Sequence, residues 1–462
     1  MSPPEPKTPL DPAVVDIPIQ SWVGGGRGLG RVDGRVWLVP GTVPGDVVQA
    51  RVSRDHGRWV AGSLVRIVSP STDRRTPPCP IQHVCGGCPL MPVDEEAQRE
   101  TKRRFVVDAL ARIGKLSGVA VDACVGSPRA LGYRNKIELT FGTQEGGPVV
   151  GYHAAHDPAR LVDVEACAIG DGRLAGALAV VRRCLADGTL PVRPGRLVLR
   201  ASASGPDVLV AFRDGGEPFP EAPGIARALA TDVPGLRGVV RLVAAPGRRG
   251  GARVETLWGE PWIEEMLLGR LYRVPAGTFL QVNPAAAETL AVDVLSEAGR
   301  PAAVLELYGG VGAIGAALAA RGARVTVVDA DPDAIACGRE TTERDGIPVR
   351  HVRADVLRFL EGTEGGPNLV VADPPRTGFG PGVAEALARL GPARIVIVSC
   401  DPATLARDTA KLSAAGYGID RVRPFDLFPQ TAHVEAVAWL TRRGSPPPPP
   451  RARSPRRAFG SH

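Results

Sequence analysis

The feature that most constrains the fold of this sequence is an alternation of apolar runs and helical patterns after residue 275. Parallel strands need long crossover connections, so this alternation predicts a parallel α/β sheet. The last segment, residues 417–440, predicts two further strands that form a hairpin at the sheet edge. The apolar runs that have the length of buried strands are VLEL, ARVTVVDAD, VRHVRAD, NLVVADPP and RIVIVSC.

The first of these strands leads into a glycine-rich loop, ELYGGVGAIG, which opens a helix. Gly310 and Gly312 would let backbone N–H groups approach a ligand closely. Asp329 lies 19 residues after Gly310, at the end of the next strand, where an acid can bind ribose hydroxyls. The loop and the acid predict an adenosine-type cofactor, and they do not separate NAD from S-adenosylmethionine.

Two reactive groups end strands of the same sheet, and the carboxyl ends of such strands form the ligand crevice. Asp373 follows the fourth strand in VVADPPRTG, and Cys400 follows the fifth in VSCDPATLARD. A helix beginning after Asp401 would lower the pKa of the Cys400 thiol, and the charge of Asp401 limits this effect to a modest shift. A thiolate that adds to C6 of uracil makes C5 nucleophilic toward a methyl sulfonium, so the pattern favours pyrimidine methylation.

A carboxylate follows in TAHVEAVAWL, where Glu435 and His433 would share one face of a strand. After methyl transfer to C5, the C5 proton must leave before the thiol is eliminated. Glu435 is the candidate general base for this step.

The sequence contains eight cysteines, and no apolar run approaches the length that spans a bilayer. The N-terminus lacks a basic apolar leader, so we expect a cytoplasmic protein without disulfides. In CPIQHVCGGC, Cys79, Cys85 and Cys88 stand close enough to bind one metal centre, with Cys167 as the preferred fourth ligand. Spacing alone permits zinc or an iron–sulfur cluster.

The N-terminal part, residues 14–72, consists of short strands and glycine turns that predict an oligonucleotide-binding type of β-barrel. The net charge of +7 permits a polyanionic partner and does not require one. A helix is predicted for residues 94–114, with Val106, Ala109, Leu110 and Ile113 on its buried face. The barrel residues that suit RNA are basic or aromatic: Arg27, Arg31, Arg51, Arg54, His56, Arg58 and Trp59.

Five motifs in this order, FLQVNP, LYGGVGAIG, VVADPPRTG, VSCDPATLARD and LFPQTAHVE, resemble those of the bacterial RNA uracil-5-methyltransferase family. That family includes the transfer-RNA and 23S ribosomal-RNA 5-methyluridine enzymes. The resemblance implies an α/β fold: a Rossmann-like class I methyltransferase domain, an N-terminal OB-like β-barrel (TRAM) and a central β-rich domain. The implied domains are 14–72 (TRAM), 73–90 with 125–274 (central, iron–sulfur) and 91–124 with 275–442 (methyltransferase), between disordered ends at 1–13 and 443–462.

The resemblance also implies roles for individual residues. Cys400 would be the nucleophile and Glu435 the base, and the cysteine set Cys79, Cys85, Cys88 and Cys167 would hold a [4Fe–4S] cluster in preference to zinc. The family loop often reads Y-C-G, whereas Gly309 stands here. The residues implied to bind S-adenosyl-L-methionine are Gln281, Tyr308, Gly310, Gly312, Asp329, Asp355 and Asp373.

The activity implied is S-adenosylmethionine-dependent methylation of uridine C5 in RNA. We expect RNA as the partner, without DNA or a membrane, and a monomer. The cysteine set favours 23S ribosomal RNA, and transfer RNA is the alternative. Three other hypotheses explain less of the sequence. An enzyme that methylates amino groups would need an aromatic residue where Arg376 stands. A nicotinamide-dependent dehydrogenase would leave Cys400 without a role, and a non-catalytic iron–sulfur RNA-binding protein would not need Glu435.

Overall fold

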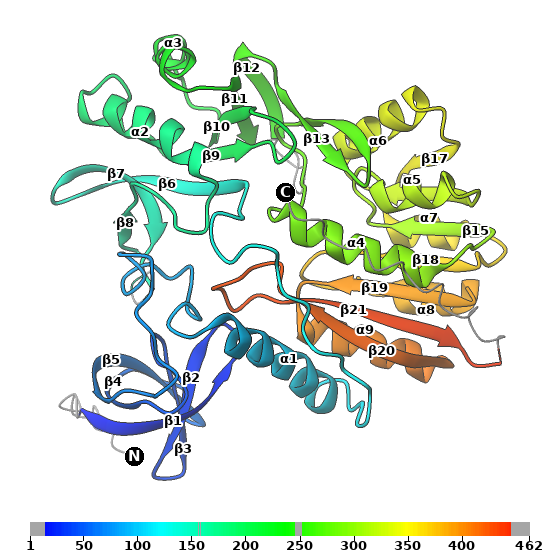
Figure 1. The fold of residues 1–462 in the computed structure, drawn as a ribbon, viewed down its shortest axis with the longest axis horizontal. Helices are drawn as coiled ribbons and strands as arrows, with labels where there is room; N and C mark the ends of the chain where they lie inside the picture. The colour runs from blue at the N-terminus through cyan, green and yellow to red at the C-terminus, as the bar shows by residue number, and fades with distance from the viewer. Residues whose placement is uncertain (1–13, 156, 158, 245–251, 445–462) are drawn as a thin grey trace, which may run out of the picture.

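The computed structural model describes residues 14–155, 157, 159–244 and 252–444. Figure 1 shows a small barrel, a β-rich central body and an α/β body. The predicted fold class is confirmed: an α/β methyltransferase-type domain accompanied by an N-terminal barrel and a central β-rich part. The predicted disorder at 1–13 lies outside the described residues, as does that at 443–462 apart from residues 443 and 444.

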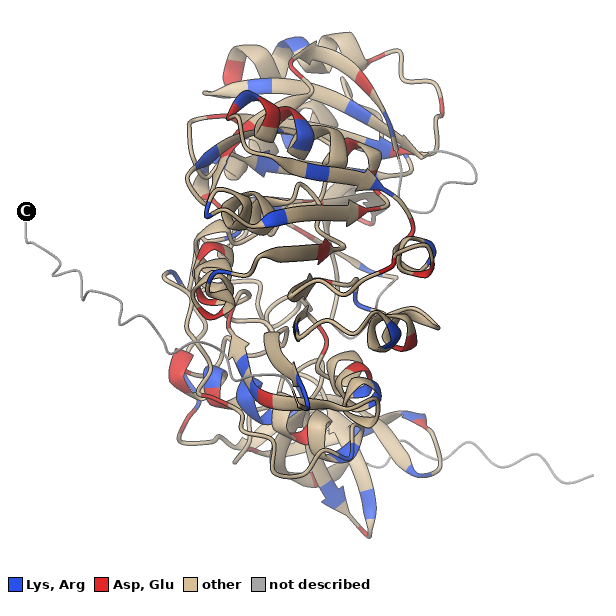
Figure 2. Ribbon diagram, turned by 90° about the vertical axis from the view of Figure 1, so that its right-hand side faces the viewer, with Lys and Arg blue, Asp and Glu red and all other residues tan. Residues whose placement is uncertain are grey.

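The N-terminal strands form a closed barrel in the order β1-β2-β3-β5-β4. Its interior is filled by residues that alternate along the strands, among them Ile17, Trp37, Val48 and Val60. Lys and Arg positions are spread over its strands, at the bottom of Figure 2. The strands are β1 (Val15–Val23), β2 (Arg27–Val32), β3 (Arg35–Val39), β4 (Val47–Asp55) and β5 (Trp59–Ser69).

The central body is a mixed sheet in the order β12-β11-β10-β9-β6-β7-β8, with the β13-β14 hairpin beside it. One face packs on α2 (Gly172–Ala186) and α3 (Ala222–Asp232), and the other packs on the hairpin and on residues of the α/β body. The strands are β6 (Lys136–Gln144), β7 (Gly147–His153), β8 (Leu161–Asp163), β9 (Arg196–Ala201), β10 (Val208–Asp214), β11 (Leu236–Ala244), β12 (Ala252–Gly259), β13 (Trp262–Leu267) and β14 (Arg270–Pro275).

The α/β body is built on a sheet in the order β17-β16-β15-β18-β19-β21-β20. The first five of these strands run parallel, and β21 is antiparallel to both of its neighbours. The predicted hairpin therefore forms, but only β20 lies at the edge, because β21 inserts beside β19. The strands are β15 (Ala303–Leu307), β16 (Arg324–Asp329), β17 (Val349–Arg353), β18 (Leu369–Ala372), β19 (Arg394–Ser399), β20 (Tyr417–Phe425) and β21 (Glu435–Arg442).

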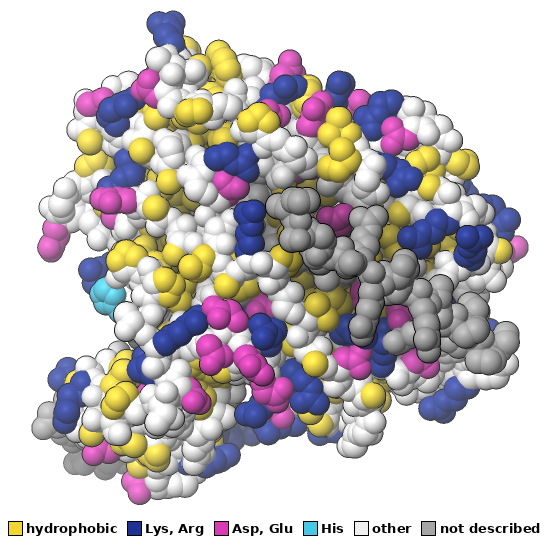
Figure 3. Space-filling view, viewed as in Figure 1, with side chains coloured by type: hydrophobic (Ala, Val, Ile, Leu, Met, Phe, Trp, Pro, Cys, Tyr) yellow, Lys and Arg dark blue, Asp and Glu magenta, His cyan; other side chains and the backbone are white. Residues whose placement is uncertain are grey.

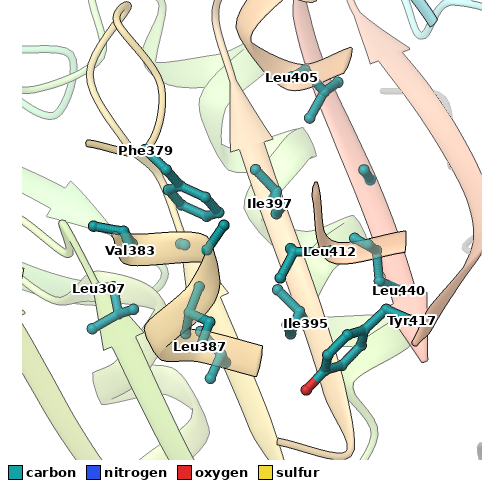
Figure 4. Close-up of a cluster of buried hydrophobic side chains, with 14 of the residues drawn as sticks. Leu307, Phe379, Val383, Leu387, Ile395, Ile397, Leu405, Leu412, Tyr417 and Leu440 are labelled. Carbon is teal, nitrogen blue, oxygen red and sulfur yellow. The ribbon is translucent and has the colours of Figure 1, made fainter. Parts of the chain in front are cut away.

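Helices cover both faces of this sheet. One layer is α4 (Pro284–Ala298), α5 (Ala313–Ala319) and α6 (Pro332–Arg344). The opposite layer is α1 (Glu95–Arg112), α7 (Val356–Glu361), α8 (Val383–Leu390) and α9 (Pro402–Ala414). Figure 4 shows its core, where Ile395 and Ile397 of β19 lie between side chains of α8 and α9. This two-sided burial explains why the central strands β18 and β19 are almost continuously apolar, whereas β17 at the sheet edge has the polar sequence VRHVR and is only partly buried.

Helix α1 differs from its prediction in one respect. Val106, Ala109 and Leu110 are buried as expected, but Ile113 is 52% exposed, because the helix ends at Arg112 and Ile113 is its C-cap. The buried stripe instead continues toward the N-terminus through Gln98 and Lys102. Two polar side chains thus occupy core positions.

The surface carries both signs of charge. Figure 3 shows basic and acidic side chains interspersed over one face of the molecule, which agrees with a modest net charge. Within the described ranges, none of the helices combines the length and the apolar character needed to cross a membrane.

Candidate active site

The loop after β15 has the open backbone that a cofactor needs. Tyr308, Gly310 and Gly312 all have positive φ, at 54°, 55° and 73°. A Cβ placed on Gly310 would meet nothing within 4 Å, so free space adjoins the loop at this residue. Gly312 is the N-cap of α5, which directs the first N–H groups of that helix toward the same loop.

Asp329, at the end of β16, is bonded to the glycine loop. Its Oδ2 accepts the Gly310 N–H at 2.8 Å, and its Oδ1 accepts the Asp331 N–H at 2.8 Å. Each oxygen keeps lone-pair capacity for a ligand hydroxyl. The acid and the loop, which the sequence assigned to one cofactor, are therefore held together by a hydrogen bond.

Glu306 is a functional candidate that the sequence reasoning missed. It lies in β15, is 4% exposed, and its Oε2 accepts the Gly315 N–H at 2.8 Å. Burial raises the pKa of this carboxyl to about 8, and Asp373 and Asp329 add to the increase. A charged residue inside an otherwise apolar strand was the available signal. The bond from the Gly315 N–H to Glu306 thus ties the glycine loop to β15, the strand that precedes it.

The other predicted cofactor residues are Asp373, Asp355 and Gln281, and they lie on different segments of the chain. Asp373 follows β18, and burial, together with Asp329, raises the pKa of its carboxyl to about 7. Asp355 caps α7 by accepting the Arg358 N–H at 3.1 Å, which gives it a structural role. Gln281 is half-buried in the segment between β14 and α4.

Cys400 and Glu435 are neighbours across two strands. The register of β19 and β21 pairs Ser399 with Ala436, and the next opposed positions are Cys400 and Glu435. Glu435 is 2% exposed, and burial raises its pKa well above the ordinary value, with Asp373 contributing. Its Oε2 has no hydrogen-bond partner among the described residues. A buried, unpaired carboxyl beside a thiol suits proton transfer.

The predicted lowering of the Cys400 pKa is wrong. Burial, together with the Glu435 and Asp373 carboxyls, raises the pKa of this thiol to about 11. The helix offers little compensation, because the Asp401 carboxylate already accepts the N–H groups of Ala403 and Thr404. The positive end of α9 is thereby satisfied by its own cap.

Arg376 is a second residue that the sequence reasoning did not assign to the site. Its Nη2 lies 2.9 Å from Nδ1 of His433. Its charge lowers the pKa of both Cys400 and Glu435, against the effect of burial. Partial burial and Arg376 also lower the pKa of His433 to about 4. Arg376 thus places a fixed cation beside the thiol and the carboxyl.

The predicted metal ligands are not confirmed as a metal site. No group of three His, Cys, Asp or Glu side chains within the described ranges has metal-binding geometry. Cys79, Cys85, Cys88 and Cys167 are nevertheless neighbours: burial raises the pKa of the Cys88 thiol to about 12, and the other three thiols add to that increase. The four cysteines are thus neighbours in space, although a metal site is not shown.

The sheet order, the glycine loop after β15 and the acid after β16 define a class I S-adenosylmethionine-dependent methyltransferase. Family models for tRNA (uracil-5-)-methyltransferase and for the methyltransferase small domain match residues 363–443 and 274–388. An uncharacterized RNA methyltransferase of Gloeobacter violaceus is 35% identical over 95% of this chain and 99% of the relative, and one of Thermotoga maritima is 32% identical over 92% and 98%.

A solved structure is similar over most of the chain. The tRNA (uracil-54, C5)-methyltransferase of Pyrococcus abyssi, in complex with S-adenosyl-L-homocysteine, has a TM-score of 0.71 and 27% identity and covers 92% of this chain and 100% of its own. The chain belongs to the RNA 5-methyluridine methyltransferase family and is an RNA (uracil-5-)-methyltransferase that uses S-adenosylmethionine.

Proposed function

We propose that this enzyme methylates C5 of a uridine in RNA through a transient covalent bond between Sγ of Cys400 and C6 of the base. The observation that carries the proposal is the closeness of Cys400, directly after β19, to Glu435 at the start of the neighbouring strand β21, whose carboxyl acts on the thiol. Both lie at the sheet edge where Asp373 follows β18. The uridine would be flipped out of its stack to reach this edge.

S-adenosylmethionine, when bound, supplies the methyl group from its sulfonium. The open space beside Gly310 and the remaining acceptor capacity of Asp329 fit an adenosine-type ligand. We assign Tyr308, Gly310, Gly312 and Asp329 to holding it. Asp373 supplies negative charge near a cationic ligand, and we propose Gln281 as a further contact.

In the proposed reaction the thiolate of Cys400 adds to C6, and the C5–C6 electron pair moves toward O4 of the base. The pair returning from O4 lets C5 bond to the methyl carbon that S-adenosylmethionine, when bound, would supply; the electron pair of its methyl–sulfur bond would leave with the sulfur of S-adenosylhomocysteine. Glu435 takes the C5 proton, the electron pair of that C–H bond re-forms the C5–C6 double bond, and the thiolate leaves from C6. Arg376 stabilises the thiolate before addition and after elimination, because its guanidinium opposes the effect of burial on Cys400.

Two variants test this mechanism. Cys400→Ala should abolish methylation while S-adenosylmethionine still binds, since the thiol lies beside Glu435 and is not among the residues assigned to the cofactor. Glu435→Gln should accumulate a protein–RNA adduct that resists denaturant, because the C5 proton stays in place. Activity retained by Cys400→Ala would exclude the covalent route.

The RNA target is proposed to be 23S ribosomal RNA, on the family resemblance of the cysteine set. Transfer RNA is the second candidate, because the Pyrococcus abyssi neighbour acts on uracil 54 of tRNA. Mass-spectrometric mapping of 5-methyluridine in both RNAs, from cells with and without the gene, separates the two. Loss of the modification from tRNA alone would refute the ribosomal assignment.

We further propose a [4Fe–4S] cluster on Cys79, Cys85, Cys88 and Cys167. The four thiols interact electrostatically, and the Gly87 N–H bonds to the Cys85 sulfur, which is a common arrangement around thiolate ligands. Anaerobically purified protein should contain iron and absorb in the visible range. Zinc without iron would overturn the cluster assignment while leaving the methyltransferase mechanism intact.

A further inference from the structure

The connection from β20 to β21, residues 426–434 and here termed the base loop, leads directly into Glu435. It is held by the buried polar side chains of α1. Lys102 donates from Nζ to Oδ1 of Asp426 at 2.5 Å and to the Phe428 carbonyl at 2.9 Å. An element more than 300 residues earlier in the chain therefore fixes the approach to the base.

One turn earlier in the helix, Gln98 holds the middle of the base loop. Its Oε1 accepts the Gln430 N–H at 2.8 Å, and its Nε2 donates to Oε1 of Gln430 at 2.9 Å. Gln430 has a φ of 72°, a conformation that costs an L residue about 1 kcal/mol or more. The two bonds from Gln98 keep Gln430 in this conformation.

The hydrogen bonds continue toward the base. Thr431 donates to the Phe428 carbonyl at 2.8 Å, the same oxygen that Lys102 contacts, and its Oγ1 accepts the His433 N–H at 3.2 Å. His433 is two residues from Glu435 and contacts Arg376. A continuous set of bonds thus joins Lys102 to His433 and, through the His433 side chain, to Arg376, whose charge acts on Cys400.

Stability alone gives little reason for this arrangement. Lys102 is 0% exposed, and burial lowers its pKa while Asp426 raises it. A buried ion pair is often less stabilising than apolar side chains of similar volume, because both charges lose their hydration. The other core positions of α1, Val106 and Leu110, are apolar. The buried pair instead fixes one geometry of the base loop.

We infer that Lys102 and Gln98 are positioning residues: they fix the base loop so that the Glu435 carboxyl meets the C5 proton of the covalent adduct. The inference rests on the proposed function, since it assumes that Glu435 is the base and Cys400 the nucleophile. Neither Lys102 nor Gln98 needs to touch the RNA or the cofactor.

The test uses Lys102→Met, which keeps the length of the side chain and removes its charge. Proton removal should slow by about 100-fold, the scale expected for a displacement of about 1 Å, so adduct accumulates relative to product. The affinity for S-adenosylmethionine should stay within about twofold, because the glycine loop follows β15, whereas the base loop that Lys102 holds joins β20 to β21. Arg104→Met, on the exposed side of the same helix, is the matched control and should behave as the unmodified enzyme.

The ratio of denaturant-resistant adduct to methylated product decides the outcome. If Lys102 has only a structural role, Lys102→Met should lower adduct and product in equal proportion, together with the melting temperature, and this result would overturn the inference. Full activity with an unchanged ratio of adduct to product would also overturn it. If Lys102→Met does not fold, Gln98→Met is measured by the same ratio. Glu435→Gln is assayed in parallel. If Glu435→Gln forms no adduct, the proposed mechanism itself is wrong. If Glu435→Gln forms adduct but Lys102→Met leaves the ratio unchanged, the mechanism stands and only the positioning role is refuted.

Discussion

At the scale of single residues, the proposed nucleophile lies where ionisation is unfavourable. The Cys400 thiol is half-buried, and two carboxyls face it with Arg376 as the opposing cation. A thiol with a raised pKa reacts slowly with solvent electrophiles. With its pKa raised to about 11, the Cys400 thiol is protonated near neutral pH, and a protonated thiol is less susceptible to oxidation than a thiolate.

This reasoning predicts the reactivity of Cys400 toward iodoacetamide. With a pKa of about 11 instead of 9, the thiolate fraction at neutral pH is about 100-fold smaller than for an unperturbed thiol. Alkylation of Cys400, followed by mass spectrometry of its peptide, should accelerate as the pH rises toward 11. Arg376→Met should slow it further at every pH below that value, and faster alkylation in this variant would contradict the assigned role of Arg376.

The buried acid Glu306 predicts a pH dependence of stability. Its folded-state pKa of about 8 lies above the ordinary value of 4.5, so unfolding releases a proton between these pH values and stability falls as the pH rises through this window. Glu306→Gln keeps an acceptor for the Gly315 N–H and has no charge to bury. Its melting temperature relative to the unmodified protein should rise from pH 5 to pH 8 and then level off. An equal difference at every pH would contradict this account.

At the scale of elements, the glycine loop depends on close packing at one position and on free space at another. A Cβ on Gly315 would lie 2.4 Å from Oε2 of Glu306, whereas a Cβ on Gly310 would meet nothing within 4 Å. Gly315 is required because the Glu306 side chain of β15 leaves no room for a Cβ at this position. Gly310 is required by the positive φ of the loop and by access for a ligand.

These two glycines give a matched pair of variants. Gly315→Ala should lower the free energy of unfolding by about 1–3 kcal/mol through overpacking. Gly310→Ala should cost about 1 kcal/mol of backbone strain, while its methyl group enters the proposed cofactor space and weakens S-adenosylmethionine binding. Thermal melting and calorimetric titration measure both effects. Equal losses of stability in the two variants would argue against the packing difference.

The sequence predicted these elements well where each rule is local. The strands, the loop after β15 and the meeting of Asp373 with Cys400 follow from apolar periodicity and from the rule that parallel strands end at one edge. The direction of the Cys400 shift could not be predicted, because it depends on burial and on Glu435, which is distant in sequence. The buried Lys102 was equally hidden, since its partner Asp426 lies on another element.

At the scale of the whole molecule, three parts of the chain converge on the base loop. The first part is α1, whose contacts are described above. The second is the central part of the chain: Leu90 donates its N–H to the Gln430 carbonyl at 3.0 Å, and the Tyr133 hydroxyl donates to the Pro429 carbonyl at 3.0 Å. The barrel reaches the same place, since Trp22 packs in a cluster with Leu90 and Ala432. The base loop is thus in contact with every part of the protein that is expected to touch RNA.

The barrel itself supplies the last prediction. His56 and Trp59 stack with ring centroids 3.9 Å apart, and Arg27 lies 5.9 Å from the centre of the indole. Stacking of a nucleobase on such a platform is worth about 1–3 kcal/mol, so Trp59→Ala should weaken binding of substrate RNA by about tenfold to 100-fold. Arg66→Gln, elsewhere on the barrel surface, is the matched control for loss of charge, with only a small change expected. Fluorescence anisotropy at fixed salt measures both, and S-adenosylmethionine affinity should not change in either variant. Equal weakening by the two substitutions would indicate that the barrel attracts RNA by charge alone and that the aromatic pair is not a stacking site.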